Sequence, residues 1–300
     1  MGSHRRLGYV AWVHGPVLLV TSVLLFGLLD ANSKVLAGQY PAAQAILIRH
    51  AVLLGLLLAA RAIRPGLGGA LGTRHPWLHL LRGLCMLSSG VGFYIAVRHM
   101  PLAMGYLVFF TAPFLMLALS RLLLREAVPA AAWGWCGVGF GGVLLALLPQ
   151  LGHGADWLGL AGALFATLCY AVNMIINRGL RAEQGFARLL IWPGILCILA
   201  SAPFATEQWV APGAMDWLRL SMNGIVAGVA AVCLAYAFRH AAPARLAPFE
   251  YVALPWSVTL DLVFFGNSPA WATLLGGAVV VAACVMSERA RAQSKSGGNR

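Results

Sequence analysis

Long apolar runs set the strongest limit on how this chain folds. PVLLVTSVLLFGLL, WGWCGVGFGGVLLALLP and WATLLGGAVVVAACVM each approach the ~20 apolar residues that a helix needs to cross a ~30 Å hydrocarbon layer. A soluble domain is about 45 to 50% apolar, whereas this chain is 60% hydrophobic and only 10% charged. The alternation typical of barrel strands is absent from these runs. The sequence therefore predicts an all-α integral membrane protein.

Ten such runs qualify as transmembrane helices. We expect them at 16–36, 42–60, 77–97, 102–120, 130–148, 157–177, 186–204, 217–238, 244–264 and 269–287. With the amino terminus inside, sixteen of the 21 Lys and Arg residues fall in inner segments, and Arg98 alone falls outside. This bias predicts a multi-pass protein of the cell inner (plasma) membrane with both termini in the cytoplasm. Membrane anchoring explains the net charge of +12, so nucleic acid is not an expected partner.

The two halves of the chain resemble each other. One nearly constant offset, a little under half the chain length, aligns Trp77 with Trp217 and Gly83 with Gly224. It also pairs Ala96 with Ala237, Arg98 with Arg239, His99 with His240 and Asn32 with Asn173. Each half holds five spans, an odd number, so the second half crosses the membrane in the opposite direction. Ten transmembrane helices in two inverted five-helix repeats are the architecture of alternating access.

The repeat predicts four segments. They are a cytoplasmic amino terminus at 1–15, a first five-span repeat at 16–148, a second and inverted repeat at 157–287, and a basic cytoplasmic tail at 288–300. A monomer or a weak homodimer is the expected assembly, embedded in the lipid bilayer.

Three stretches carry a resemblance to a known family. They are DANSKVL followed by the intramembrane Arg49, RHMPLAMGYLVFFTAPFLMLALSRLLLREAV with its late Glu126, and WATLLGGAVVVAACV. The chain resembles the EamA-type transporters of the drug/metabolite transporter superfamily over roughly 16–287. This resemblance implies transport of amino acids, including aromatic ones, or of nucleoside-like and other small metabolites, often outward. The second half departs from the family pattern, because FFGNSP places Asn267 where the family usually has Gly-Glu.

Charged residues inside spans are candidates for the transport pathway, since each costs at least ~2.5 to 3.5 kcal/mol near the bilayer centre. Asp30 and Lys34 are one helical turn apart, which allows an ion pair, and Arg49 lies at similar depth. The alternative is a structural pair, with Lys34 and Arg49 reaching the membrane surface. Asn32 and its repeat mate Asn173 are further pathway candidates.

The ninth span supplies a second set of candidates. Glu250 and Tyr251 precede Pro255 and Trp256, and we interpret Glu250 as a proton or cation site. Pairing of Glu250 with Arg245 or Arg239 is the structural alternative. Pro255 is a helix kink that frees a backbone carbonyl, and its repeat mate Pro113 kinks the fourth span beside the ligand-stacking candidate Tyr106.

The remaining polar residues are harder to assign. Arg82 is a pathway candidate, although it can also extend to the inner surface together with His79. Asp261 is expected to reach water at the outer end of the ninth span. GVGFGG at 137–142 matches a nucleotide-binding pattern, but it lies inside a span, so we interpret it as a helix-packing segment.

These features predict a secondary transporter rather than an enzyme, with no cofactor and no metal. The expected cargo is a small amphipathic metabolite, with amino acids, aromatic ones included, as the first choice and export as the direction. Protons are the expected coupling ion, through Asp30 or Glu250, with uniport as the alternative. Uptake of a cationic or nucleoside-like metabolite is the second hypothesis. A channel is a less favoured alternative, and so is a membrane-embedded enzyme, for which no paired acid and base or metal cluster is visible.

Overall fold

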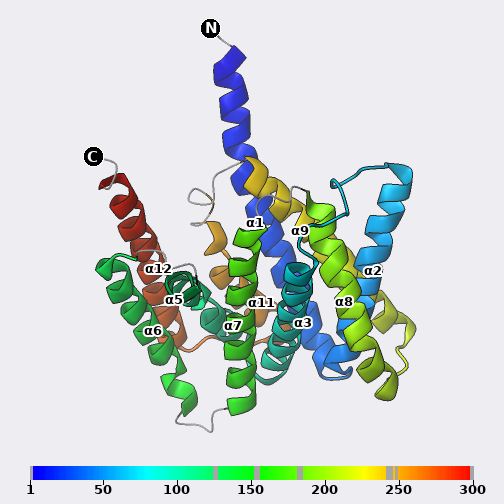
Figure 1. Cartoon of the computed structure of the whole chain (residues 1–300). Helices are drawn as coiled ribbons and strands as arrows, with labels where there is room; N and C mark the ends of the chain where they lie inside the picture. Colours follow the sequence, from blue (N-terminus) through cyan, green and yellow to red (C-terminus); the bar gives the residue numbers. More distant parts are fainter. Residues whose placement is uncertain are drawn as a thin grey trace. The chain divides into compact units, whose positions relative to one another are not determined.

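The protein is all-helical in its described parts. The computed structural model describes residues 3–123, 128–151, 156–180, 185–240, 246 and 249–297, and every regular element in these ranges is a helix (Figure 1). The all-α prediction is therefore confirmed. Within these ranges, nine helical segments are long and apolar enough to cross a membrane, with Leu102–Leu123 counted as one segment. The ninth expected span, 244–264, is represented by the shorter apolar helix α11 (Ala253–Phe265), and residues 244, 245, 247 and 248 of this span lie outside the described ranges.

The helices group into two compact units. Unit 1 contains residues 1–84 and 182–256, and unit 2 contains residues 85–181 and 257–300. Each unit therefore takes helices from both halves of the sequence, and helices α3 (Pro76–His99) and α11 contribute to both units.

Unit 1 is built from long helices that pack in pairs. In addition to the start of α3, it contains α1 (Ser3–Ala37), α2 (Ala42–Ile63), α8 (Phe186–Glu207) and α9 (Ala214–His240). Helix α1 packs along α9, and α2 packs against both α8 and α9. A Cβ atom at Gly224 of α9 would lie 2.6 Å from the Cβ of Val52 on α2. The glycine thus allows these two helices to approach closely, as small residues do in membrane proteins.

The loop between α2 and α3 is fastened to the start of α8. Arg188 Nε donates to the Ala70 carbonyl at 3.0 Å, and Trp192 Nε1 donates to the Leu71 carbonyl at 3.0 Å. Gly68 has a φ of +74°, and a Cβ there would lie 2.8 Å from the Cβ of Ala187. Any other residue at this position would be strained and would clash with α8.

Unit 2 packs its helices in the same paired manner. In addition to the remainder of α3 and α11, it contains α4 (Leu102–Phe109), α5 (Ala112–Leu123), α6 (Ala130–Leu151), α7 (Trp157–Gly179) and α12 (Trp271–Gly297). Helix α6 lies along α12 (Figure 1). A Cβ at Gly142 would lie 2.9 Å from the Gly276 carbonyl oxygen, so both glycines are needed for this close approach. Gly142 closes the GVGFGG segment, which here serves helix packing.

The fourth expected span is interrupted at its middle. Helix α4 ends at Phe109 and α5 begins at Ala112, one residue before Pro113. Proline has no N–H group to donate to the preceding turn, so the helix ladder is broken there. The Thr111 amide and the Thr111 hydroxyl both donate to the Val108 carbonyl, at 3.0 and 2.7 Å, so this acceptor keeps its partners at the break. In unit 1, Pro255 lies in the first turn of α11.

Candidate functional site

Four aromatic side chains form a cluster inside unit 2, which we call the aromatic cluster. Phe93 of α3 contacts Tyr106 and Phe109 of α4, with ring centroids 5.7 Å apart in both pairs and interplanar angles of 89° and 71°. Phe109 in turn contacts Tyr170 of α7 at 4.7 Å. All four side chains are half-buried, so part of each ring remains open to a neighbour. Such edge-to-face rings offer a stacking surface to an aromatic or aliphatic group.

Asn173 lies one turn beyond Tyr170 on α7 and adds a polar group beside the aromatic cluster. Its side chain is only 6% exposed, and its Oδ1 atom has no hydrogen-bond partner among the described residues. The Oδ1 atom of Asn177, one further turn along α7, is also without a partner in the described chain. An unsatisfied buried amide oxygen costs about 1 to 3 kcal/mol. The two oxygens are therefore acceptors available to a bound donor group.

Unit 1 contains an amide network in which, unlike at Asn173 in unit 2, the amide side chains are hydrogen-bonded to each other and to neighbouring groups. Asn32 of α1 donates from Nδ2 to the Arg219 carbonyl at 2.9 Å and to Asn223 Oδ1 at 2.7 Å. Asn223 of α9 donates from Nδ2 to the Ser33 hydroxyl at 3.0 Å. The network thus connects α1 to α9 through three hydrogen bonds with good geometry.

A second polar group continues this connection at the same ends of the two helices. The Tyr40 hydroxyl donates to Asp216 Oδ2 at 2.8 Å, and Arg219 Nη1 donates to Asp216 Oδ1 at 3.2 Å. Tyr40 lies between α1 and α2, where burial, followed by its bond to Asp216, raises the pKa of its hydroxyl. The tyrosine therefore remains a donor at neutral pH.

The charged candidates of the first repeat all fall in unit 1. Asp30 and Lys34 lie one turn apart on α1, and Arg49 lies on α2. All three side chains are half-buried, and each takes part in at least one polar or electrostatic interaction. Asn32 lies between Asp30 and Lys34 in the chain, so the amide network and the charged residues share one segment of α1.

Arg82 does not extend to the inner membrane surface, which was the alternative to a role in the transport pathway. Its side chain is buried, and Nη1 donates to the Leu189 carbonyl of α8 at 2.8 Å. The Nε atom has no partner within the described residues. The side chain is buried against α8 instead of being hydrated, so the expectation that Arg82 extends to the inner surface is wrong.

The candidates of the ninth span lie at the start of α11. Trp256 Nε1 donates to the Leu24 carbonyl of α1 at 3.0 Å, so its polar edge is engaged within unit 1. Tyr251 is half-buried and Glu250 is exposed. Arg245 and the side chain of Arg239, the alternative partners of Glu250, lie outside the described part of the chain, as does Glu126.

Asp261 corrects another sequence expectation, because it does not reach water. Its side chain is 2% exposed and caps α4. Oδ1 accepts from the Leu102 amide at 3.0 Å, and Oδ2 accepts from the Ala103 amide at 2.7 Å. A carboxylate satisfies the free amides at a helix start and interacts favourably with the helix dipole, which explains why a charge is buried here.

Sequence reasoning missed Asn223, Phe93 and Tyr170. Asn223 stands within an otherwise apolar part of WLRLSMNGI, and a lone amide in a span is a usable signal. Phe93 and Tyr170 carried no such signal, because single aromatics in apolar helices are most often packing residues. Only the pairing of α3, α4 and α7 identifies them.

The described ranges, with nine candidate spans and buried charged and amide side chains, define a multi-pass membrane protein. Residues 157–288 match the EamA-like transporter family. Transporter relatives that align with 70% to 92% of the chain support this match, so the chain is similar to EamA-type transporters of the drug/metabolite transporter superfamily, and its named relatives are transporters rather than enzymes.

Similar proteins include both exporters and uptake transporters. The chain is 25% identical over 278 residues to the pseudopaline exporter CntI of Pseudomonas aeruginosa, and the alignment covers 92% of this chain and 96% of the exporter. It is 27% identical over 283 residues to a riboflavin transporter of Rhizobium johnstonii, covering 92% and 91%. An S-adenosylmethionine uptake transporter of Rickettsia conorii is 25% identical over 212 residues, covering 70% and 71%.

The fold is shared with a solved protein structure. It aligns with a TM-score of 0.65 at 20% identity, and the alignment covers 91% of this chain and 96% of the other. At this identity the likeness concerns the fold alone.

Proposed function

We propose that this protein is a secondary transporter that moves a small amphipathic metabolite across the inner membrane by alternating access. In this proposal, residues 16–148 and 157–287 are two inverted repeats of five spans, flanked by cytoplasmic termini. The fifth span of the first repeat then corresponds to the tenth span of the chain, so α6 and α12 are repeat mates that pack together in unit 2. Inverted repeats supply two equivalent packings of one sequence, which is what alternating access requires.

The observation that carries this proposal is a pair of matching glycine contacts in unit 1. A Cβ at Gly224 would lie 2.6 Å from the Cβ of Val52, and a Cβ at Gly83 would lie 3.2 Å from the Cα of Pro193. The separation in sequence between Gly83 and Gly224 equals the separation between Val52 and Pro193. One contact therefore occurs twice with the roles of the halves exchanged, as a pseudo-two-fold relation between inverted repeats predicts.

Two serine contacts support the same relation. Ser22 of α1 donates to the Ala230 carbonyl of α9 at 2.8 Å in unit 1. Ser89 of α3 donates to the Ala166 carbonyl of α7 at 3.0 Å in unit 2. Ser89 and Ala230 are separated in sequence by the same offset that aligns Gly83 with Gly224, and Ala166 lies one helical turn beyond Ala163, the residue that this offset pairs with Ser22. The first span is thus hydrogen-bonded to the eighth, and the third span is hydrogen-bonded to the sixth. In the proposed repeat the first span corresponds to the sixth and the third to the eighth, so the two pairs are related.

The aromatic cluster and Asn173 support an amphipathic cargo. A ring or aliphatic group would stack on Tyr106 and Phe109, while an N–H or O–H group would donate to Asn173 Oδ1. A free amino acid with an aromatic side chain carries both kinds of group. We therefore retain amino acids as the first substrate class and export as the direction, with proton coupling through Asp30 or Glu250.

Uptake of a cationic or nucleoside-like metabolite is the second candidate. Relatives that are a riboflavin transporter and S-adenosylmethionine uptake transporters favour it. Both compounds carry a flat heterocycle that would stack on the same aromatic cluster. Export and uptake thus predict the same binding surface and differ in the direction of flux.

Reconstituted vesicles test the carrier mechanism and separate the two candidates. L-tryptophan and L-phenylalanine are the probes for the first substrate class, and S-adenosylmethionine and riboflavin are the probes for the second. A carrier gives saturable flux and counterflow, in which unlabelled substrate inside accelerates entry of labelled substrate. Flux that rises linearly with concentration and shows no counterflow would identify a channel and overturn the proposal.

A further inference from the structure

Arg82 of α3 is a buried cation in unit 1 whose charge is not explained by its contacts with the protein. Its side chain is 7% exposed, and Nη1 donates to the Leu189 carbonyl of α8 at 2.8 Å. The Nε atom is buried without a hydrogen-bond partner in the described part of the chain. A guanidinium stays charged in a protein and has five N–H donors. We propose that Arg82 binds the carboxylate group of the cargo, so that the cargo is a metabolite that carries a carboxylate.

The hydrogen bond to Leu189 has a local cause. Pro193 lies four residues further along α8, and proline has no N–H to donate to the Leu189 carbonyl. Arg82 Nη1 supplies the missing donor. A neutral donor such as an amide would also satisfy this carbonyl, so the contact explains neither the charge of Arg82 nor the state of its Nε atom.

The charge of Arg82 is not offset by an acidic side chain either. Arg82 forms no ion pair with any residue that the structure describes. The neighbouring loop brings further guanidinium groups, because Arg61 Nη1 donates to the Gly69 carbonyl at 2.9 Å. Arg188 Nε donates to the Ala70 carbonyl at 3.0 Å in the same loop. A buried charge needs a partner, and for Arg82 that partner is the ligand.

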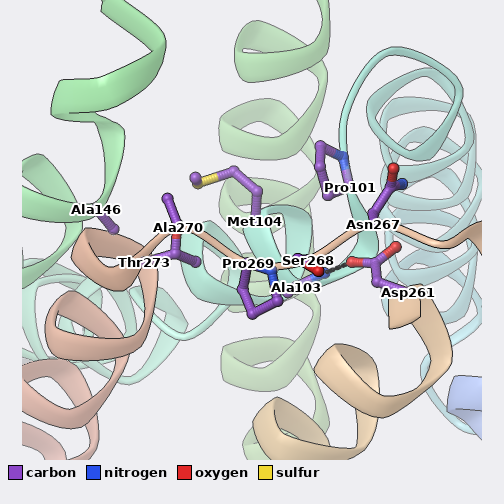
Figure 2. A pocket seen from close by; sticks show the side chains of 10 residues that line it. All are labelled: Pro101, Ala103, Met104, Ala146, Asp261, Asn267, Ser268, Pro269, Ala270 and Thr273. Atoms are coloured by element: carbon purple, nitrogen blue, oxygen red, sulfur yellow. Dashed lines mark hydrogen bonds between the residues drawn. The ribbon is translucent and has the colours of Figure 1, made fainter. Parts of the chain in front are cut away.

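Asp261 of unit 2 is also a buried charge, but its charge is explained by its contacts. Figure 2 shows its carboxylate beside Ala103, and the two oxygens accept from the amides of Leu102 at 3.0 Å and Ala103 at 2.7 Å. The positive end of the α4 dipole thus offsets a negative charge. Arg82 has the opposite arrangement, because Leu189 lies in the first turn of α8. The positive end of a helix disfavours a cation and favours an anion beside it.

The geometry of the guanidinium selects a carboxylate. Because Nη1 is held by Leu189, the edge that carries Nε is left for a ligand, and two N–H groups on one edge match the two oxygens of a carboxylate. The indole of Trp192 lies one turn beyond Leu189 and is 39% exposed. Its Nε1 donates to the Leu71 carbonyl at 3.0 Å, which fixes the ring. An apolar body attached to the carboxylate would pack on this ring.

This inference rests on the proposed function, since a buried site must become accessible at some stage of a transport cycle. In this structure the Nε atom is closed off from solvent, and alternating access opens a site to one face at a time. Amino acids, the first substrate class, carry the required carboxylate. The two proposals fail in different ways. Absence of counterflow would remove the carrier mechanism, whereas binding that does not depend on the carboxylate would remove only the role of Arg82.

Ligand-induced thermal stabilisation of the purified full-length protein tests the site, because a ligand that prefers the folded state raises the melting temperature. The probe is 3-phenylpropionate, and 3-phenylpropanamide is an uncharged control of nearly the same shape. We expect 3-phenylpropionate alone of these two to stabilise the wild-type protein in a saturable manner. Inorganic phosphate has no apolar body, and it should bind at least about tenfold more weakly, a difference of about 1.4 kcal/mol.

Two variants assign the effect to Arg82. Arg82→Gln removes the charge and keeps an N–H donor, and we expect it to weaken 3-phenylpropionate binding at least about tenfold, or about 1.4 kcal/mol. Arg82→Lys keeps the charge without the paired N–H edge, so its loss should be smaller. Arg219→Gln is the matched control, because the Arg219 guanidinium is also in unit 1 but is paired with Asp216 at 3.2 Å. It should bind like the wild type.

The melting temperature without ligand separates a binding role from a structural one. Removal of a charge that has no counter-ion should leave Arg82→Gln at least as stable as the wild type. A structural guanidinium would instead give a less stable variant that still binds the probe. Equal stabilisation of the wild type by 3-phenylpropionate and 3-phenylpropanamide, or normal binding of 3-phenylpropionate by Arg82→Gln, would overturn the proposal. The first result does so even if neither Arg82 variant folds.

Discussion

Asn32 and Asn173 are aligned with each other when the two halves of the chain are compared, yet their side chains are in opposite states. In unit 1, Asn32 donates two hydrogen bonds to α9, one to a carbonyl and one to Asn223. In unit 2, the Oδ1 atom of Asn173 is buried and has no partner within the described residues. The same amide thus stabilises a helix pair in one unit and leaves an open acceptor beside aromatic rings in the other.

The difference distinguishes an amide side chain that holds two helices together from one that can bind a ligand. A hydrogen-bonded amide between helices contributes about 0.6 kcal/mol, and at most about 1.7 kcal/mol, in a membrane protein. An unsatisfied amide oxygen costs about 1 to 3 kcal/mol and is retained only where something else requires it. We infer that Asn32 serves the α1–α9 packing and that Asn173 serves the cargo.

The largest effect is expected from the charges that flank Asn32. The double replacement Asp30→Asn with Lys34→Met removes an opposite pair together, so a purely structural pair would tolerate it. We expect monodisperse, membrane-inserted protein with at least about tenfold slower flux, equivalent to about 1.4 kcal/mol in the barrier, and an altered pH dependence. Flux is measured in vesicles with the best of the four probes. Near wild-type flux would show that Asp30 and Lys34 have only a structural role, and Glu250 would then be the candidate for proton coupling.

Replacing Asn32 itself should affect stability and not transport. Asn32→Leu leaves the Arg219 carbonyl and Asn223 Oδ1 without their donor, so we expect a loss of roughly 1 kcal/mol in unfolding free energy. Flux per folded molecule should remain within about threefold of the wild type, well under 1 kcal/mol in the barrier. Adding Asn223→Leu should recover part of the stability, because both polar partners are then removed. A large loss of flux at unchanged stability would show that Asn32 and Asn173 share one role.

Removing a ring from the aromatic cluster should change selectivity. Tyr106→Leu loses the contact with Phe93, and an aromatic pair is worth about 0.5 to 1.5 kcal/mol. We expect the ratio of L-tryptophan flux to L-leucine flux to fall by as much as about tenfold, in line with that energy. Phe186→Leu is the matched control, since Phe186 packs on Tyr236 in unit 1 at 6.2 Å and lies outside the cluster. If both variants change the ratio equally, the cluster has no special part in recognition.

The smallest effect concerns the cap of α7, the helix that carries Asn173. Asp156 accepts from the Gly159 and Leu158 amides and contacts His99 Nδ1 at 2.7 Å. The backbone bond to Gly159, followed by the bond to His99, lowers the pKa of the Asp156 carboxyl. Because the folded pKa is depressed, its stabilisation is present above the unfolded pKa of about 3.9 and is lost as pH falls through the folded value.

Melting temperatures of the wild type and Asp156→Asn, measured as a function of pH, test this pH dependence. The variant should melt slightly lower at neutral pH, and the gap should close on acidification below about pH 4. His99→Gln should have a smaller effect, because it keeps both backbone bonds to Asp156. A gap that widens as the pH falls would contradict the assignment, as would loss of transport in Asp156→Asn.

The sequence predicts the helices better than it predicts their neighbours. Apolar length is a local property, so the helices of both halves and the interruption near Pro113 follow from the residues themselves. The grouping of α1 with α9 and of α4 with α7 depends on contacts between distant segments, which no local pattern reports. Asp261 shows the limit clearly, since a carboxylate near a span end suggested water, while its actual partners are backbone amides 158 and 159 residues earlier.

The candidate site shows the same contrast between local sequence properties, which could be predicted, and contacts between distant segments, which could not. Residues that are unusual within a span, such as Asn32, Asn173 and Arg82, were visible as candidates because polarity in lipid is costly. Which of them is engaged and which is open was not visible, because that depends on the helix opposite. Phe93 and Tyr170 became site candidates only when their rings were found against Phe109 and Tyr106.

Cargo binding to Asn173→Leu is the most direct test of the account. Purified wild type, Asn173→Leu and Asn32→Leu are compared by thermal shift against L-tryptophan, L-phenylalanine, S-adenosylmethionine and riboflavin. The account predicts that at least one probe raises the melting temperature of the wild type and of Asn32→Leu in a saturable manner. The same probe should leave that of Asn173→Leu unchanged, although this variant folds at least as stably as the wild type. Equal stabilisation of Asn173→Leu and the wild type by such a probe would contradict the assignment of Asn173 to the cargo.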